Sequence, residues 1–187
     1  MYAPRLPCAS NTPLETCLLS VAFKTLGCKL NQAETETMAA AFSNAGFPVV
    51  SSENDAGLLI VNTCAVTSKA EQKGRRMIRA ALRRNPDCCV LVTGCYAELN
   101  RNDLESLDDS IQQGSVSKRI FIVPGIQKNA IMDMPSRLAH DGIRNAESLG
   151  AALEKFCFSG TDDTFRFEAA KTALRSRVFL KIQDGCD

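Results

Sequence analysis

Residues Gly57–Cys64, GLLIVNTC, are the most informative part of this chain for its fold class. Its apolar run from Gly57 to Asn62 is unbroken, which is typical of a strand that is buried on both faces of a parallel sheet. The run ends at Thr63-Cys64. The sequence therefore predicts a central parallel strand with a cysteine directly beyond its carboxyl end.

The order of strand then helix recurs on both sides of this stretch. Hydrophobic periodicity predicts further strands at Ser20–Leu26, Pro48–Ser51, Cys89–Thr93 and Ile120–Val123. It predicts helices at Asn31–Gly46, Ser68–Arg84, Asn102–Leu107 and Lys128–His140. This alternation favours an α/β fold of three layers with a mostly parallel, flavodoxin-like sheet.

The composition is that of an ordinary folded domain. The chain has 187 residues, of which 45% are hydrophobic and 23% charged, and its formal net charge is +1. These values exclude collagen-like, low-complexity and disordered chains. No stretch approaches the roughly 18 unbroken apolar residues of a membrane helix, so we expect no membrane partner. Because the net charge is close to zero, any contact with nucleic acid must come from a local basic patch.

The nine cysteines are the unusual feature of the composition. An odd number in a chain large enough to build its own core argues against a disulfide framework. The opening residues Met1–Ser20 lack the apolar region of a secretory signal, so we predict a cytoplasmic location. In that compartment thiols stay reduced and are available for metal binding or catalysis.

Three cysteines, Cys28, Cys64 and Cys95, each follow the end of a predicted strand. The carboxyl ends of parallel strands meet at one edge of a sheet, where ligands bind. Three thiolates at that edge suit an iron–sulfur cluster or a soft metal ion. The alternative is that each thiol is a small buried hydrophobic group. A thiol-redox protein is disfavoured because the chain has no CxxC pair.

The residues around these cysteines resemble the three cysteine motifs of the methylthiotransferase N-terminal domain. The three stretches are Thr25–Glu36 (TLGCKLNQAETE), Val61–Thr67 (VNTCAVT) and Val92–Glu98 (VTGCYAE). In that family the motifs hold an auxiliary [4Fe–4S] cluster, so the resemblance implies that Cys28, Cys64 and Cys95 are its ligands. Three ligands leave one iron open to exchange. We expect five neighbours to approach or support the cluster, with ordinary turn and helix-start roles as the alternative: Gly27, Asn31, Asn62, Thr63 and Gly94.

The last residues, Phe179–Asp187 (FLKIQDGCD), resemble the entry to the radical S-adenosylmethionine domain of the same family. Cys186 matches the first of the three cysteines that hold a second [4Fe–4S] cluster there. That cluster also needs the other two cysteines, which this chain does not contain. We therefore expect a truncated chain that is inactive by itself, with S-adenosylmethionine and the second cluster bound only in a full-length form. The predicted organisation is an extension at 1–19, a methylthiotransferase N-terminal domain at 20–140, a linker at 141–176 and the start of the radical domain at 177–187.

The motifs look most similar to the branch that converts N6-threonylcarbamoyladenosine at tRNA position 37 to its 2-methylthio derivative. The implied partners are the tRNA anticodon-loop adenosine and a sulfur donor at the open iron. The alternatives are the isopentenyl-adenosine tRNA branch, the ribosomal-protein aspartate branch, and a cluster-free α/β binding module or remnant. The resemblance assigns no catalytic residue to this chain, and the sequence leaves its oligomeric state open.

The predicted helix Ser68–Arg84 is strongly basic, with Glu71 as its one acidic residue. Such a face is suited to tRNA phosphates, and its alternative is an ordinary solvated helix. The candidate RNA contacts are Lys73, Arg75, Arg76, Arg79 and Arg83.

Overall fold

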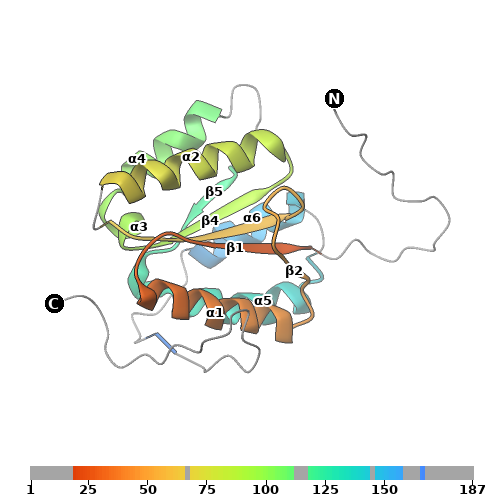
Figure 1. Cartoon of the computed structure of the whole chain (residues 1–187). Coiled ribbons are helices and arrows are strands. Elements are labelled where there is room, and N and C mark those ends of the chain that lie inside the picture. Colours follow the sequence, from red (N-terminus) through yellow and green to blue (C-terminus); the bar gives the residue numbers. More distant parts are fainter. Residues whose placement is uncertain (1–18, 66–67, 112–117, 144–145, 158–164, 167–187) are drawn as a thin grey trace.

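The computed structural model describes residues 19–65, 68–111, 118–143, 146–157 and 165–166 (Figure 1). The strands are β1 (Val21–Thr25), β2 (Val49–Val50), β3 (Leu58–Thr63), β4 (Cys89–Gly94) and β5 (Ile120–Ile122). They form one sheet in the order β2-β1-β3-β4-β5, and every described pair is parallel. This is the flavodoxin-like strand order, so the predicted fold class is confirmed.

Helices cover both faces of the sheet (Figure 1). One face carries α1 (Lys29–Asn44), α5 (Asn129–His140) and α6 (Ala146–Cys157). The other face carries α2 (Ser68–Arg84), α3 (Cys95–Leu99) and α4 (Arg101–Ile111). A 3₁₀ turn, η1 (Gly125–Gln127), leads into α5. None of the described helices is long and apolar enough to cross a membrane.

The alternating side chains of the central strands explain the unbroken apolar run. Leu58 and Ile60 of β3 pack in the core under α1, whereas Leu59 and Val61 pack in the core under α2. Each of these four side chains is fully buried. Because both faces are covered by helices, the strand has no solvated side, and alternation with polar residues is lost.

The boundaries of two helices next to the cysteines differ from the prediction. α1 begins at Lys29, so Cys28 directly precedes its first residue. α3 was not predicted, and it begins at Cys95 itself. With five residues, α3 is too short to show a helical period in the sequence. Two of the three cysteines therefore lie at helix starts as well as at strand ends.

The predicted linker at 141–176 contains a packed helix. Leu149, Leu153 and Phe156 of α6 have helical spacing and are buried in the core under α1 and α5. The mixed charge around them concealed this apolar face, so the linker interpretation is wrong for 146–157. The other predicted domain boundaries stay predictions. Residues 1–18 and 177–187, including Cys186, lie outside the described residues.

Candidate metal centre

The three cysteine-bearing strand ends lie side by side at the carboxyl edge of the sheet. Cys64 follows Thr63 at the end of β3, and Cys95 follows Gly94 at the end of β4. Thr63 and Gly94 are register partners in the sheet. β1 is the other neighbour of β3, and the N–H of Leu26 donates to the Asn62 carbonyl at 2.9 Å. The topology therefore brings Cys28, Cys64 and Cys95 to three adjacent strand ends, although they are far apart in the sequence.

Two glycines allow the cysteine loops to approach each other closely. A Cβ at Gly27 would lie 2.7 Å from the Cβ of Cys64. At Gly94, φ is +97°, and a Cβ would overlap the Thr63 carbonyl oxygen and lie 2.7 Å from Oδ1 of Asn62. Neither position has room for a side chain. Both glycines therefore allow close approach between the cysteine loops, and their expected approach to a cluster stays a prediction.

The three thiols differ in their surroundings. Cys28 and Cys95 are exposed, whereas Cys64 is 7% exposed. Cys28 is the N-cap residue of α1 and its Sγ donates a hydrogen bond to Oδ1 of Asn31 at 3.1 Å. The first turn of α1 contains no acidic residue, so the positive end of the helix dipole is unopposed by a side chain of that turn.

The donor set fits an iron–sulfur cluster, but it is not gathered into a finished site. Within the described residues, no group of three or more His, Cys, Asp or Glu side chains is arranged to hold a metal ion. The three cysteines nevertheless supply the sulfur donors that such clusters use. The side chain of Cys28 would have to leave Asn31 to ligate iron.

Comparison with known proteins shows the family of this chain. Residues 20–113, half of the chain, match the family described as Uncharacterized protein family UPF0004, the N-terminal domain of methylthiotransferases. The chain belongs to this family. Methylthiotransferase N-terminal domains normally bind a [4Fe–4S] cluster, and the three cysteine motifs lie within the matched residues.

Similar curated proteins are tRNA-modifying enzymes by name. The Threonylcarbamoyladenosine tRNA methylthiotransferase MtaB of Treponema pallidum is 44% identical over 65% of this chain and 24% of its own length. MtaB of Bacillus subtilis is 41% identical over 91% of this chain and 34% of its own length. The tRNA-2-methylthio-N(6)-dimethylallyladenosine synthase of Moorella thermoacetica is 30% identical over 71% of this chain and 35% of its own length. The chain thus spans between about a quarter and a third of these relatives.

An amide network supports the cysteine loops of this methylthiotransferase domain. Asn62 is fully buried, and its Nδ2 lies 3.1 Å from the Asn31 carbonyl and 3.2 Å from Oε2 of Glu34. Asn31 donates from its own Nδ2 to Oδ1 of Asn62 at 3.3 Å and to the Thr63 carbonyl at 3.0 Å. Both asparagines therefore link the start of α1 to the end of β3. Thr63 donates from its hydroxyl to the Thr93 carbonyl at 2.6 Å, which links β3 to β4.

The sequence analysis missed two charged residues of this methylthiotransferase domain. Glu34 lies on the inner face of α1, and its Oε2 is 2.5 Å from Nζ of Lys128, at the start of α5. The signal in the sequence was an acidic residue three positions after Asn31, on the face that also carries Met38. The partner Lys128 had no comparable signal, because only the tertiary fold brings it to Glu34.

The candidate RNA contacts on α2 divide into two groups. Arg75 donates to the Tyr96 hydroxyl at 3.2 Å and to Asp103 at 3.0 Å, so it links α2 to α3 and α4. Burial raises the pKa of Tyr96, and the Arg75 guanidinium offsets part of that rise. The other four candidates are exposed: Lys73, Arg76, Arg79 and Arg83. Arg75 is therefore a contact within the domain rather than a member of the open basic face.

Cys88 and Cys89 do not belong to the candidate metal centre. Both are buried at the opposite end of β4 from Cys95. Burial raises the pKa of the Cys88 thiol to about 11, so this group stays protonated at neutral pH. The two residues pack as small apolar groups, which makes Cys88 a suitable control for the three candidate ligands.

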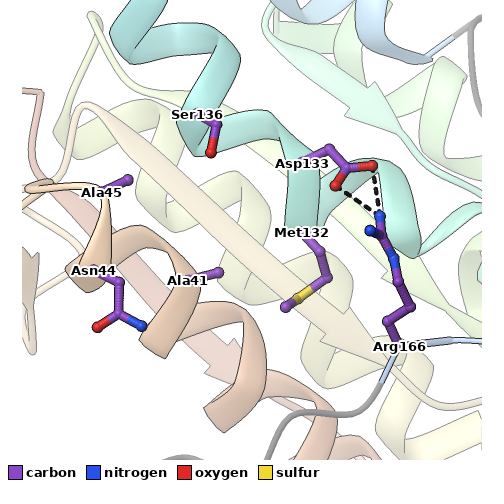
Figure 2. A pocket seen from close by; sticks show the side chains of 7 residues that line it. All are labelled: Ala41, Asn44, Ala45, Met132, Asp133, Ser136 and Arg166. Carbon is purple, nitrogen blue, oxygen red and sulfur yellow. Dashed lines mark hydrogen bonds and ion pairs between the residues drawn. The ribbon is translucent and has the colours of Figure 1, made fainter.

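A cavity of about 270 Å³ lies between α1 and α5 (Figure 2). Its lining includes Asn44 and Ala45 at the end of α1, whereas Cys28 precedes the start of that helix. Arg166 closes one side by donating to both carboxylate oxygens of Asp133 at 2.6 Å. No cysteine lines this cavity, so it is not part of the candidate metal centre.

Proposed function

We propose that this domain holds a [4Fe–4S] cluster through Cys28, Cys64 and Cys95 and is the sulfur-delivering part of a tRNA methylthiotransferase. The observation that carries the proposal is the placement of three thiols at adjacent ends of β1, β3 and β4. When bound, the cluster supplies an iron with an open position, because three thiolates leave one of four irons without a protein ligand. That position would hold the sulfur donor.

Three groups of residues would contribute to binding the cluster: the cysteines, the glycines before two of them, and the start of α1. Cys64 is buried at the end of β3, whereas Cys28 and Cys95 are exposed, so the two exposed thiols are the ones that would have to turn toward a common centre. Gly27 and Gly94 leave space for backbone N–H groups close to the cluster sulfurs. The start of α1 favours a bound group that carries negative charge.

The proposed substrate is N6-threonylcarbamoyladenosine at position 37 of tRNA. Five relatives named for this modification are 29% to 44% identical, two of them above 40%, whereas two relatives named for the dimethylallyladenosine modification are 30% and 29% identical. The isopentenyl-adenosine and ribosomal-protein branches are the alternatives, together with a cluster-free module. S-adenosylmethionine and a second cluster, with Cys186 as one ligand, belong to the proposal for a full-length form in the cytoplasm.

Anaerobic reconstitution with iron and sulfide tests the cluster directly. The wild-type chain is expected to bind about four irons and to absorb near about 400 nm. The Cys28→Ala/Cys64→Ala/Cys95→Ala variant is expected to bind none, because its sulfur ligands are removed. Iron and sulfide analysis together with the visible spectrum measure both results.

The matched control for this experiment is Cys88→Ala, which removes a buried thiol outside the site. Its iron content is expected to equal that of the wild type. Equal iron in the wild type, the triple variant and the control would contradict the proposed ligands. Circular dichroism shows whether each variant keeps the α/β fold.

We also propose that the exposed basic face of α2 contacts tRNA phosphates. The face comprises Lys69, Lys73, Arg76, Arg79, Arg83 and Arg84, all exposed. α2 follows the Cys64 loop and runs back along the sheet from the edge that carries the cysteines (Figure 1). An RNA backbone along this helix would therefore lie next to the candidate metal centre.

Removing two of these charges is expected to weaken RNA binding in a salt-dependent way. For Arg76→Ala/Arg79→Ala, the slope of log affinity against log salt for an anticodon stem-loop should fall by about 2, or about 0.9 per lost phosphate contact. Fluorescence anisotropy at several salt concentrations measures the slope. The control Arg137→Ala/Lys155→Ala removes the same charge from α5 and α6. An equal loss in both variants would contradict a specific role for α2.

A further inference from the structure

A polar layer replaces the apolar core at the carboxyl end of the sheet. Phe23, Ile60 and Leu91 are register partners that lie in or against the core under α1. Two residues further along, the register partners on the same face are Thr25, Asn62 and Thr93. The side of the sheet that packs against α1 therefore turns from apolar to polar directly below the cysteines.

An ion pair is buried at this layer. The side chains of Lys128 and Glu34 are 10% and 6% exposed, and they are the only charged residues among those described that are buried. Burial of two charges removes their hydration, and the pair recovers this cost only with good geometry and additional hydrogen bonds. Glu34 has such a bond, because Nδ2 of Asn62 lies 3.2 Å from the oxygen that Lys128 contacts.

The ion pair is connected to Cys28 through side chains alone. Lys128 and Asn62 both contact Oε2 of Glu34. Oδ1 of Asn62 accepts from Asn31, and Oδ1 of Asn31 accepts from Sγ of Cys28. Lys128, which follows Glu34 by 94 positions, is thus linked by hydrogen bonds to the loop that carries the exposed Cys28.

We propose that Lys128 and Glu34 are positioning residues for the Cys28 loop. Their ion pair fixes the amide of Asn62, which in turn holds Asn31 and the loop against the end of β3. The inference rests on the proposed function for what Cys28 binds, but the positioning exists in the chain without iron and is testable there. A pair that only stabilised the fold would protect all elements of the domain alike.

Two backbone amides report on the loop. The N–H of Leu26 donates to the Asn62 carbonyl at 2.9 Å, and the N–H of Gln32 donates to the Cys28 carbonyl at 3.2 Å. The N–H of Asn85, which donates to the Ala81 carbonyl at 2.9 Å on the far face of the sheet, is the reference. Hydrogen exchange followed by NMR gives the opening rate at each of the three positions.

In Lys128→Met, the amides of Leu26 and Gln32 are expected to exchange about tenfold faster than in the wild type, with Asn85 unchanged. Lys128→Arg is expected to restore most of the protection, because a guanidinium can also donate to Glu34. The control is Asp133→Asn. It breaks the exposed ion pair between Asp133, which lies on α5, and Arg166 (Figure 2), and it should leave the exchange of the Leu26 and Gln32 amides unchanged.

If Lys128→Met does not fold, Glu34→Gln/Lys128→Met removes both charges and decides the question, with the same faster exchange expected. Uniform acceleration at all three amides, or none at Leu26 and Gln32, would overturn the proposal. Reconstituted Lys128→Met is expected to lose iron to a chelator about tenfold faster than the wild type, and Lys128→Arg at the wild-type rate. A wild-type chain that binds no iron would contradict the proposed function and leave the exchange result standing.

Discussion

Gly94→Ala is expected to lower the free energy of unfolding by about 3–5 kcal/mol, enough to unfold a marginal domain. Two causes act together at this position. The backbone has φ of +97°, which an alanine adopts only with strain, and the new Cβ would overlap the Thr63 carbonyl oxygen. Thr63 belongs to the adjacent strand, so relief requires β3 and β4 to separate at their carboxyl ends. Urea unfolding followed by circular dichroism measures the loss.

Gly142→Ala separates the two causes. Gly142 has φ of +65°, but a Cβ there would meet nothing within 4 Å. Gly142→Ala is therefore expected to lower the free energy of unfolding by about 1 kcal/mol, which is the backbone strain alone. Equal losses in the two variants would show that the close approach of Gly94 to Thr63 contributes nothing.

Asn62→Leu is expected to cost about 3 kcal/mol of unfolding free energy, because it keeps the branched arrangement of four side-chain heavy atoms but removes a buried amide. In the wild type, Oδ1 of Asn62 accepts a hydrogen bond from Asn31, and its Nδ2 donates to Glu34 and to the Asn31 carbonyl. Each buried partner left without a hydrogen bond adds about 1–3 kcal/mol. Denaturant unfolding gives the stability, and hydrogen exchange at Leu26 shows whether the start of α1 loosens.

Thr93→Val is the matched control, since Thr93 is the register partner of Asn62 on β4. The hydroxyl of Thr93 is buried, and it has no hydrogen-bond partner among the described residues. Replacing it with a methyl group is expected to change stability by less than about 0.5 kcal/mol or to increase it. A large loss in Thr93→Val would mean that the whole polar layer, rather than the Asn62 amide, carries the effect.

Local sequence was sufficient to predict the sheet and the place of the cysteines. The buried strands are unbroken apolar runs, and each of the three cysteines stands beyond such a run, so parallel pairing alone brings them to one edge. The glycines before Cys28 and Cys95 were also informative, because close approach excludes every other residue there. These features depend on neighbours in sequence or on the general geometry of parallel sheets.

The remaining features depend on contacts that have no local pattern. Lys128 lies between a 3₁₀ turn and α5, and nothing near it in the sequence shows that Glu34 is its partner. Arg75 looked like the other basic residues of α2 until the fold placed it against Tyr96 and Asp103. Such pairings follow from the packing of whole elements, which periodicity does not contain.

The separation between Glu34 and Lys128 also sets the order of events during synthesis. The two residues are 94 positions apart, so at about 5–20 residues per second Lys128 is made roughly 5–20 s after Glu34. Cys28 is part of the growing chain when this interval begins, and Cys64 and Cys95 are added during it, while the Lys128 partner of Glu34 is still missing. The network around Cys28 is thus completed late in translation, and nascent chains pass through a period in which Glu34 lacks its partner and the Cys28 loop is not yet held in place.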